Sequence, residues 1–400
     1  MENDIIKRND MSISRIVLII AVILSVFSQI ESVEKYTRIG MYIAWALVLV
    51  IGVFRKKGRV AIDSFSRRFL IAYVFYFVIT FLIGLIDSHH FFSNYIRVLI
   101  VPLVVTIAGG MYSDEEKYYI DCLVRVYLIS SVIFGFWVQR TYFPSYTYWL
   151  SSRVYVFQQK NSAGQIWISA IFASLFLLEF RNKIDKIIVY ILCLFLFIMT
   201  CISQCRTAIL GFVFALSTFA ISKAKHKIRW ALVLGISAIA LWFIPFTHSF
   251  IEQALFLNKY AGADINTFSS GRIDHYVNAW SNFITSPVFG VGKYYVDNSY
   301  ISILTESGLI GFVIIEYVWI NKITLCLKFQ GDLSEQGFLS IIIPFYFIES
   351  LLEGYPPFGP GVSSFMFWFL SSILINKSKY SSDDISDVVL ELPDPEVINE

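Results

Sequence analysis

The chain has 400 residues, of which 56% are hydrophobic, 17% aromatic and only 16% charged. No single water-soluble core could bury so much apolar surface, so lipid must surround most of the chain, and we expect no nucleic-acid partner. The formal net charge of +2 hides an asymmetry, because about seven acids and no base fall in the last twenty residues. The remainder of the chain is therefore clearly basic.

Twelve apolar runs, each about 16 to 20 residues long, can cross the hydrocarbon core of a bilayer. We therefore predict an all-α, polytopic membrane protein with about 12 transmembrane helices, in a single membrane domain over residues 1–376. The acidic residues 377–400 predict a disordered cytoplasmic tail. The predicted spans are 13–30, 39–54, 69–86, 95–111, 118–137, 163–180, 184–202, 207–222, 228–246, 299–320, 338–352 and 362–376.

Basic residues cluster in alternate loops between these spans, which predicts that those loops and both termini are cytoplasmic. Two stretches on the opposite, outer side are longer than ordinary connections: 138–162, and 247–298 between helices 9 and 10. Long loops often carry function. We therefore expect the functional site at the outer face.

Lys and Arg are disfavoured on the outer side, so those found there indicate an anionic ligand. Arg206 is the most informative, because it lies in S-Q-C-R-T, a short turn between two apolar helices. A cluster of guanidinium groups suits a pyrophosphate attached to a lipid, although contact with lipid headgroups explains any one of them equally well. The outer basic residues are Arg97, Arg140, Arg153, Lys160, Arg206, Lys259, Arg272 and Lys293.

The polar stretch 269–280 predicts a short helix in the second long loop. Ser270 is a suitable N-cap, and helical periodicity places Arg272 and His275 on one face, away from the apolar face. Two adjacent histidines elsewhere, His89 and His90, point apart and form no metal site. We expect no metal, and the absence of nucleotide-binding and paired Cys/His motifs predicts no cofactor.

The span that follows this loop begins at D-N-S, where Asp297 and Asn298 can cap the helix and leave its positive end available to an anion. Ser299, Ser302 and Glu306 lie along one face of it, which carries a carboxylate into the membrane. Such an acid faces protein or water rather than lipid, and either a function or a buried hydrogen bond explains Glu306.

Three further features have a structural or a functional interpretation. Gly308 and Gly311 permit close helix packing. Asp121 and Arg125, four residues apart, predict an ion pair within one helix. A second polar stripe, Tyr346, Glu349 and Glu353, indicates either a site or a hydrogen bond to a neighbouring helix.

The motifs of residues 269–312 resemble those of the O-antigen polymerase and ligase superfamily. They are S-G-R, a tryptophan eight residues after this arginine, P-V-F-G-V-G, D-N-S-Y and E-S-G-L-I-G-F. Q-K-N-S-A-G at 159–164 and the stretch 203–211 around Arg206 are similar to the family's other arginine- and asparagine-bearing segments. The resemblance extends over the second half of the chain in motifs and over the whole chain in architecture.

The resemblance implies a multi-pass protein of the bacterial inner membrane with a large periplasmic loop. It also implies glycosyl transfer from undecaprenyl pyrophosphate, with lipid-linked oligosaccharides as substrates and without nucleotide sugar or metal. It leaves open a partner protein that regulates chain length. O-antigen ligases typically carry a histidine before the motif asparagine, where this chain has Asp297, so a polymerase of the Wzy type is expected.

Site roles follow from this resemblance together with charge. For pyrophosphate and sugar binding we expect Arg206 and Arg272 first, then Arg153, Lys160, Asn161 and Asn298. For the acceptor base we expect Asp297 first and His275 second, with Glu306 orienting either. Two rivals remain: an O-antigen ligase, and a flippase or transporter of lipid-linked oligosaccharide, which shares the helix count and the outer basic residues.

Overall fold

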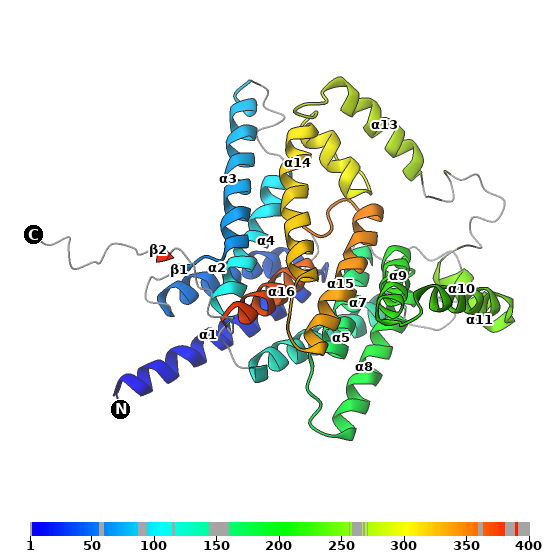
Figure 1. The fold of residues 1–400 in the computed structure, drawn as a ribbon, viewed down its shortest axis with the longest axis horizontal. Helices are drawn as coiled ribbons and strands as arrows, with labels where there is room; N and C mark the ends of the chain where they lie inside the picture. Colours follow the sequence, from blue (N-terminus) through cyan, green and yellow to red (C-terminus); the bar gives the residue numbers. More distant parts are fainter. Residues whose placement is uncertain are drawn as a thin grey trace, which may run out of the picture.

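The computed structural model describes residues 2–55, 60–86, 94–113, 117–143, 160–255, 257, 266, 269, 271–358, 363–380 and 389–390. Helices dominate this part of the chain (Figure 1). In the first half they are α1 (Glu2–Phe27), α2 (Glu34–Arg55), α3 (Ser64–Gly84), α4 (Asn94–Met111), α5 (Lys117–Tyr142) and α7 (Lys160–Leu177). The second half has α8 (Lys183–Ile202), α9 (Arg206–Lys223), α10 (Lys227–Phe243), α11 (Pro245–Ala254), α13 (Arg272–Thr285), α14 (Ser299–Leu327), α15 (Leu333–Leu352) and α16 (Ser363–Tyr380). Two-residue strands β1 (Val60–Ala61) and β2 (Val389–Leu390) pair antiparallel, with Val60 opposite Leu390.

Each of the twelve apolar runs falls largely on one of these helices, so the predicted helical fold is confirmed for the part of the chain that the structure describes. Within the described residues, seven helices are long and apolar enough to cross a membrane, or eight if the bent pair α10 and α11 is one span. They are α2, α3, α8, α9, α14, α15 and the Tyr119–Tyr142 part of α5. These helices indicate a multi-pass membrane protein, and the number of twelve spans stays a prediction.

The predicted loops contain more helix than expected. α5 continues to Tyr142 and α7 begins at Lys160, which removes both ends from the predicted loop 138–162. The second predicted loop, 247–298, contains most of α11 and all of α13. Residues 377–380, which were predicted to begin the tail, form the end of α16, which continues to Tyr380. Residues 144–159, 381–388 and 391–400 lie outside the described residues.

The packing is that of a protein with lipid outside. Four tryptophans, Trp45, Trp167, Trp319 and Trp368, are fully buried. Large apolar side chains are nevertheless exposed along α3, α8, α10 and α14. A water-soluble protein would not leave so much contiguous apolar surface uncovered, so these faces suit contact with acyl chains.

The predicted ion pair inside one helix is confirmed. Arg125 Nε lies 2.7 Å from Asp121 Oδ2. The same guanidinium also contacts Asp185 Oδ1 of α8 at 2.8 Å. The pair therefore joins α5 to α8, a contact that the four-residue spacing could not reveal.

α14 is broken at Gly308, whose φ of 63° and ψ of −167° are not helical. L-residues avoid this backbone region, and a Cβ at this position would lie 2.3 Å from the Val288 carbonyl oxygen. A Cβ on Gly290 would similarly lie 2.4 Å from the Glu306 carbonyl oxygen. Gly308 therefore admits the backbone of segment 287–292 rather than a neighbouring helix, and its predicted packing role is wrong.

Segment 287–292 replaces the helical hydrogen bonds that α14 loses at this break. Four backbone bonds do so: Val291 N to Thr305 O (2.9 Å), Gly292 N to Glu306 O (3.1 Å), Leu309 N to Pro287 O (2.9 Å) and Ile310 N to Val288 O (3.3 Å). The motifs P-V-F-G-V-G and E-S-G-L-I-G-F are thus two sides of one backbone junction. This junction fixes α13 against the beginning of α14.

Gly308→Ala is expected to destabilise the protein by at least about 1–3 kcal/mol from backbone strain alone, with the steric overlap added. Gly235→Ala in α10 is the matched control, because a Cβ there would meet nothing within 4 Å. Thermal unfolding of the two purified variants in detergent measures the difference. Equal melting temperatures for both variants would show that the junction is not rigid.

Candidate functional site

Four helix N-termini meet the C-terminal end of α15. The Cys205 thiol, at the start of α9, donates to the Lys160 carbonyl oxygen at the start of α7 (2.9 Å). Asn298, before α14, donates through Nδ2 to the Leu351 carbonyl oxygen of α15 (2.9 Å). The beginning of α13 reaches the same place through Arg272, which forms an ion pair with Glu353 at the end of α15. Because helix N-termini present free N–H groups and a positive dipole end, their convergence suits an anionic group.

The close approach of α7 and α9 depends on small side chains. A Cβ on Gly164 would lie 2.8 Å from the Cβ atoms of both Cys205 and Ala208. Lys160 and Arg206, the first residues of these two helices, are both partly buried. The structure thus brings two of the predicted binding cations to one end of the helix bundle.

Arg272 is the centre of the site. Its Nη2 lies 3.1 Å from Glu353 Oε1, and its Nε lies 3.3 Å from Asp297 Oδ2. Its side chain is 18% exposed. Burial lowers the pKa of Arg272, but attraction to Glu353 and Asp297 outweighs it and raises the pKa, so the guanidinium stays charged.

The residue that caps α13 differs from the prediction. Gly271, with φ of 81°, occupies the N-cap position, and Ser270 lies outside the described residues. The left-handed conformation of Gly271 sets the direction in which α13 starts. Arg272, the first helical residue, forms an ion pair at the end of α15, whereas His275 is exposed.

Asp297 accepts hydrogen bonds from two tyrosines in addition to its ion pair with Arg272. The Tyr295 hydroxyl donates to Asp297 Oδ1 (2.9 Å), and the Tyr276 hydroxyl of α13 donates to the Asp297 carbonyl oxygen (2.8 Å). Burial, followed by repulsion from the nearby carboxylates, raises the pKa of Tyr295, which keeps this phenol protonated. Asp297 is thus a fixed and partly exposed carboxylate.

Glu353 has a buried carboxyl group. From the sequence, this residue could belong either to a site or to a hydrogen bond with a neighbouring helix. Only 8% of the residue is exposed, and Asn161 Nδ2 donates to its Oε1 (2.7 Å). Burial outweighs the attraction of Arg272 and raises the pKa of Glu353 to about 7. This group therefore changes charge near neutral pH.

Glu349 lies one turn earlier on α15 and extends the polar cluster inward. Gln165 Nε2 of α7 donates to its Oε2 (2.8 Å). Its Oε1 is buried without a hydrogen-bond partner in the part of the chain that the structure describes. The two acids of the predicted polar stripe, Glu349 and Glu353, thus face α7, whereas Tyr346 packs against Phe367 of α16 with ring centroids 5.0 Å apart. The four-residue spacing of the two acids at the end of an apolar run was the available signal.

The other predicted residues lie in different settings. Asn298 caps α14, since its Oδ1 accepts from Ile301 N (2.9 Å), as predicted. Ser299, Ser302 and Glu306 are all buried, which confirms that this face meets protein. His275 is exposed on α13, and Arg153 lies outside the described residues.

Residues 191–315 match a family model described as O-antigen ligase. The matched segment runs from α8 to α14, so it includes Arg206, Arg272 and Asp297 but neither Asn161 nor Glu353. No curated protein matches the chain. The match supports the O-antigen ligase and polymerase superfamily, and an enzyme that processes lipid-linked glycans, without separating polymerase from ligase.

Proposed function

We propose that this protein is a surface-polysaccharide polymerase at the periplasmic face of the bacterial inner membrane, with both termini in the cytoplasm. It transfers a growing glycan from undecaprenyl pyrophosphate to a hydroxyl group on a second lipid-linked repeat unit. The observation that carries this proposal is the placement of Arg272 between Asp297 and Glu353, where four helix N-termini converge. Such a place offers an anion site beside two carboxylates.

The pyrophosphate is bound by Arg272, Arg206 and Lys160, with Arg153 as a further contact. Guanidinium groups and exposed backbone N–H groups both suit phosphate oxygens. As the bond between the anomeric carbon and the pyrophosphate oxygen breaks, negative charge grows on the leaving group. Cations already fixed in position stabilise that charge without reorganisation.

The acceptor hydroxyl loses its proton as its oxygen bonds to the anomeric carbon. We propose that Glu353 takes this proton, because a base with a pKa of about 7 is best matched to neutral pH. Asp297, our first expectation for this role, instead orients Arg272 and remains the second candidate. His275 is the third, and Glu306 is a positioning residue at the break in α14.

A ligase is the nearest rival, because the matched family model carries that description. The replacement of the ligase histidine by Asp297 favours the polymerase. A flippase is disfavoured, since the polar groups gather at one end of the bundle rather than at mid-membrane in two matching halves. A polymerase of this type would also admit a chain-length regulator as partner.

The test is the surface polysaccharide of a deletion strain, with and without the native gene. A polymerase null is expected to leave lipid A core capped with a single repeat unit, and the native gene restores the ladder. Loss of all surface repeat units would overturn the proposal. Accumulation of the lipid-linked unit at the periplasmic face would then indicate a ligase, and accumulation inside the cell a flippase.

A further inference from the structure

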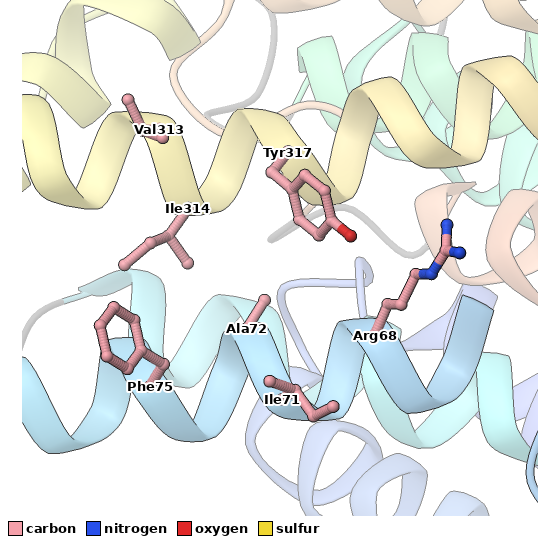
Figure 2. A pocket seen from close by; sticks show the side chains of 7 residues that line it. All are labelled: Arg68, Ile71, Ala72, Phe75, Val313, Ile314 and Tyr317. Atoms are coloured by element: carbon pink, nitrogen blue, oxygen red, sulfur yellow. The ribbon is translucent and has the colours of Figure 1, made fainter. Parts of the chain in front are cut away.

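A groove of about 360 Å³ lies between α3 and α14, outside the candidate site. Figure 2 shows Phe75 and Ala72 of α3 facing Ile314 and Tyr317 of α14 across it, with Arg68 at one end. Ala72 has only a methyl group, which leaves a gap opposite the larger side chains of α14.

The groove is open on a face that suits lipid. Both α3 and α14 are among the helices long and apolar enough to span a membrane. Phe75 is 57% exposed and Val313 is 64% exposed. Because the lining is apolar except at one end, an acyl chain fits its length better than water or a peptide does.

The polar end of the groove has the donors that a phosphate group needs. Arg68 donates through Nη1 to Asn321 Oδ1 at 3.4 Å, which is long for a hydrogen bond. Among the described residues, no carboxylate forms an ion pair with this guanidinium. Tyr317 lies one helical turn from Asn321 and lines the same groove. A guanidinium group left with such weak pairing is complementary to an anionic headgroup.

This end is far from the candidate site. Asn321 lies thirteen residues beyond the break at Gly308, or about 20 Å along the helix. A lipid with its phosphate at Arg68 therefore cannot place the same phosphate near Arg272. The groove requires a separate molecule, and its occupation does not depend on the proposed transfer reaction.

We infer that this groove binds an anionic glycerophospholipid of the bilayer. Its phosphate contacts Arg68, with Tyr317 and Asn321 beside it, and one acyl chain lies against Ala72, Phe75 and Ile314. The chain fills the gap between α3 and the second part of α14. At the other end of this interface, the Tyr76 hydroxyl lies 2.9 Å from Ser307 Oγ, next to the break.

The test measures phosphatidylglycerol retained by the purified protein in native mass spectrometry. Arg68→Gln is expected to weaken retention by about tenfold or more, because it removes a charge-assisted contact with phosphate. Arg67→Gln is the matched control, since Arg67 is a neighbouring exposed arginine that does not line the groove. Ala72→Phe fills the groove without changing charge and is expected to lower retention as well.

Three outcomes would overturn the inference. Equal losses for Arg67→Gln and Arg68→Gln would show general attraction of lipid to a basic surface. Equal retention of phosphatidylcholine and phosphatidylglycerol by the native protein would show that the headgroup charge is not recognised. Displacement of phosphatidylglycerol by a polyprenyl phosphate at equal concentration would identify the sugar carrier as the occupant. If Ala72→Phe does not fold, the comparison of Arg68→Gln with Arg67→Gln still decides the first point.

Discussion

Arg272→Gln is expected to lower the rate of glycan transfer by about 10²- to 10³-fold, as the loss of one preorganised group that stabilises developing charge typically does. The substitution leaves Glu353 and Asp297 close together without the cation that both contact. Arg272→Lys keeps the charge but loses the forked geometry, so an intermediate rate is expected. Elongation of a lipid-linked repeat unit by the purified protein, followed by gel analysis of product length, measures the rates.

The matched control for Arg272 is Lys293→Gln, which removes an exposed cation from the segment between α13 and α14. We expect this variant to elongate at nearly the native rate. Size-exclusion profiles of each variant separate lost chemistry from lost folding. A folded Arg272→Gln protein with native activity would exclude this residue from the reaction.

Glu353→Gln is expected to lower kcat by about 10²- to 10⁴-fold, the usual contribution of a general base, with little change in KM. A base acts when deprotonated. Because the pKa of Glu353 is about 7, native kcat/KM should rise as pH increases through about 7 and then level off. The variant should lose this rise, whereas Glu353→Asp should retain part of the rate. Initial rates between pH 5.5 and about 8.5 measure both effects.

Asn161→Ala distinguishes a catalytic base from a structural counter-ion. The hydrogen bond from Asn161 lowers the pKa of Glu353, so its removal should shift the rise in kcat/KM to higher pH. A purely structural Glu353 would alter stability without moving the profile. The base assignment fails if Glu353→Gln keeps the native rise at the same pH, and Asp297 then becomes the first candidate.

Local patterns determined the features that the sequence predicted correctly. Apolar runs identified the helices, because a single segment surrounded by lipid can satisfy all its backbone hydrogen bonds internally only as a helix. The spacing of Asp121 and Arg125 predicted their ion pair, and the D-N-S sequence predicted a cap that Asn298 provides. Each of these interactions joins residues within a few positions of one another.

Tertiary structure alone decided which of the polar residues form one site. Asn161 and Glu353 are 192 positions apart, and no local period relates them. The pairing of segment 287–292 with broken α14 and the direction set by Gly271 likewise depend on backbone geometry between elements. The amino-acid sequence by itself determined a helical membrane protein with basic groups near a long polar segment. Long-range packing decided that Arg272 meets two carboxylates, because only burial between helices brings such charges together and sets their protonation.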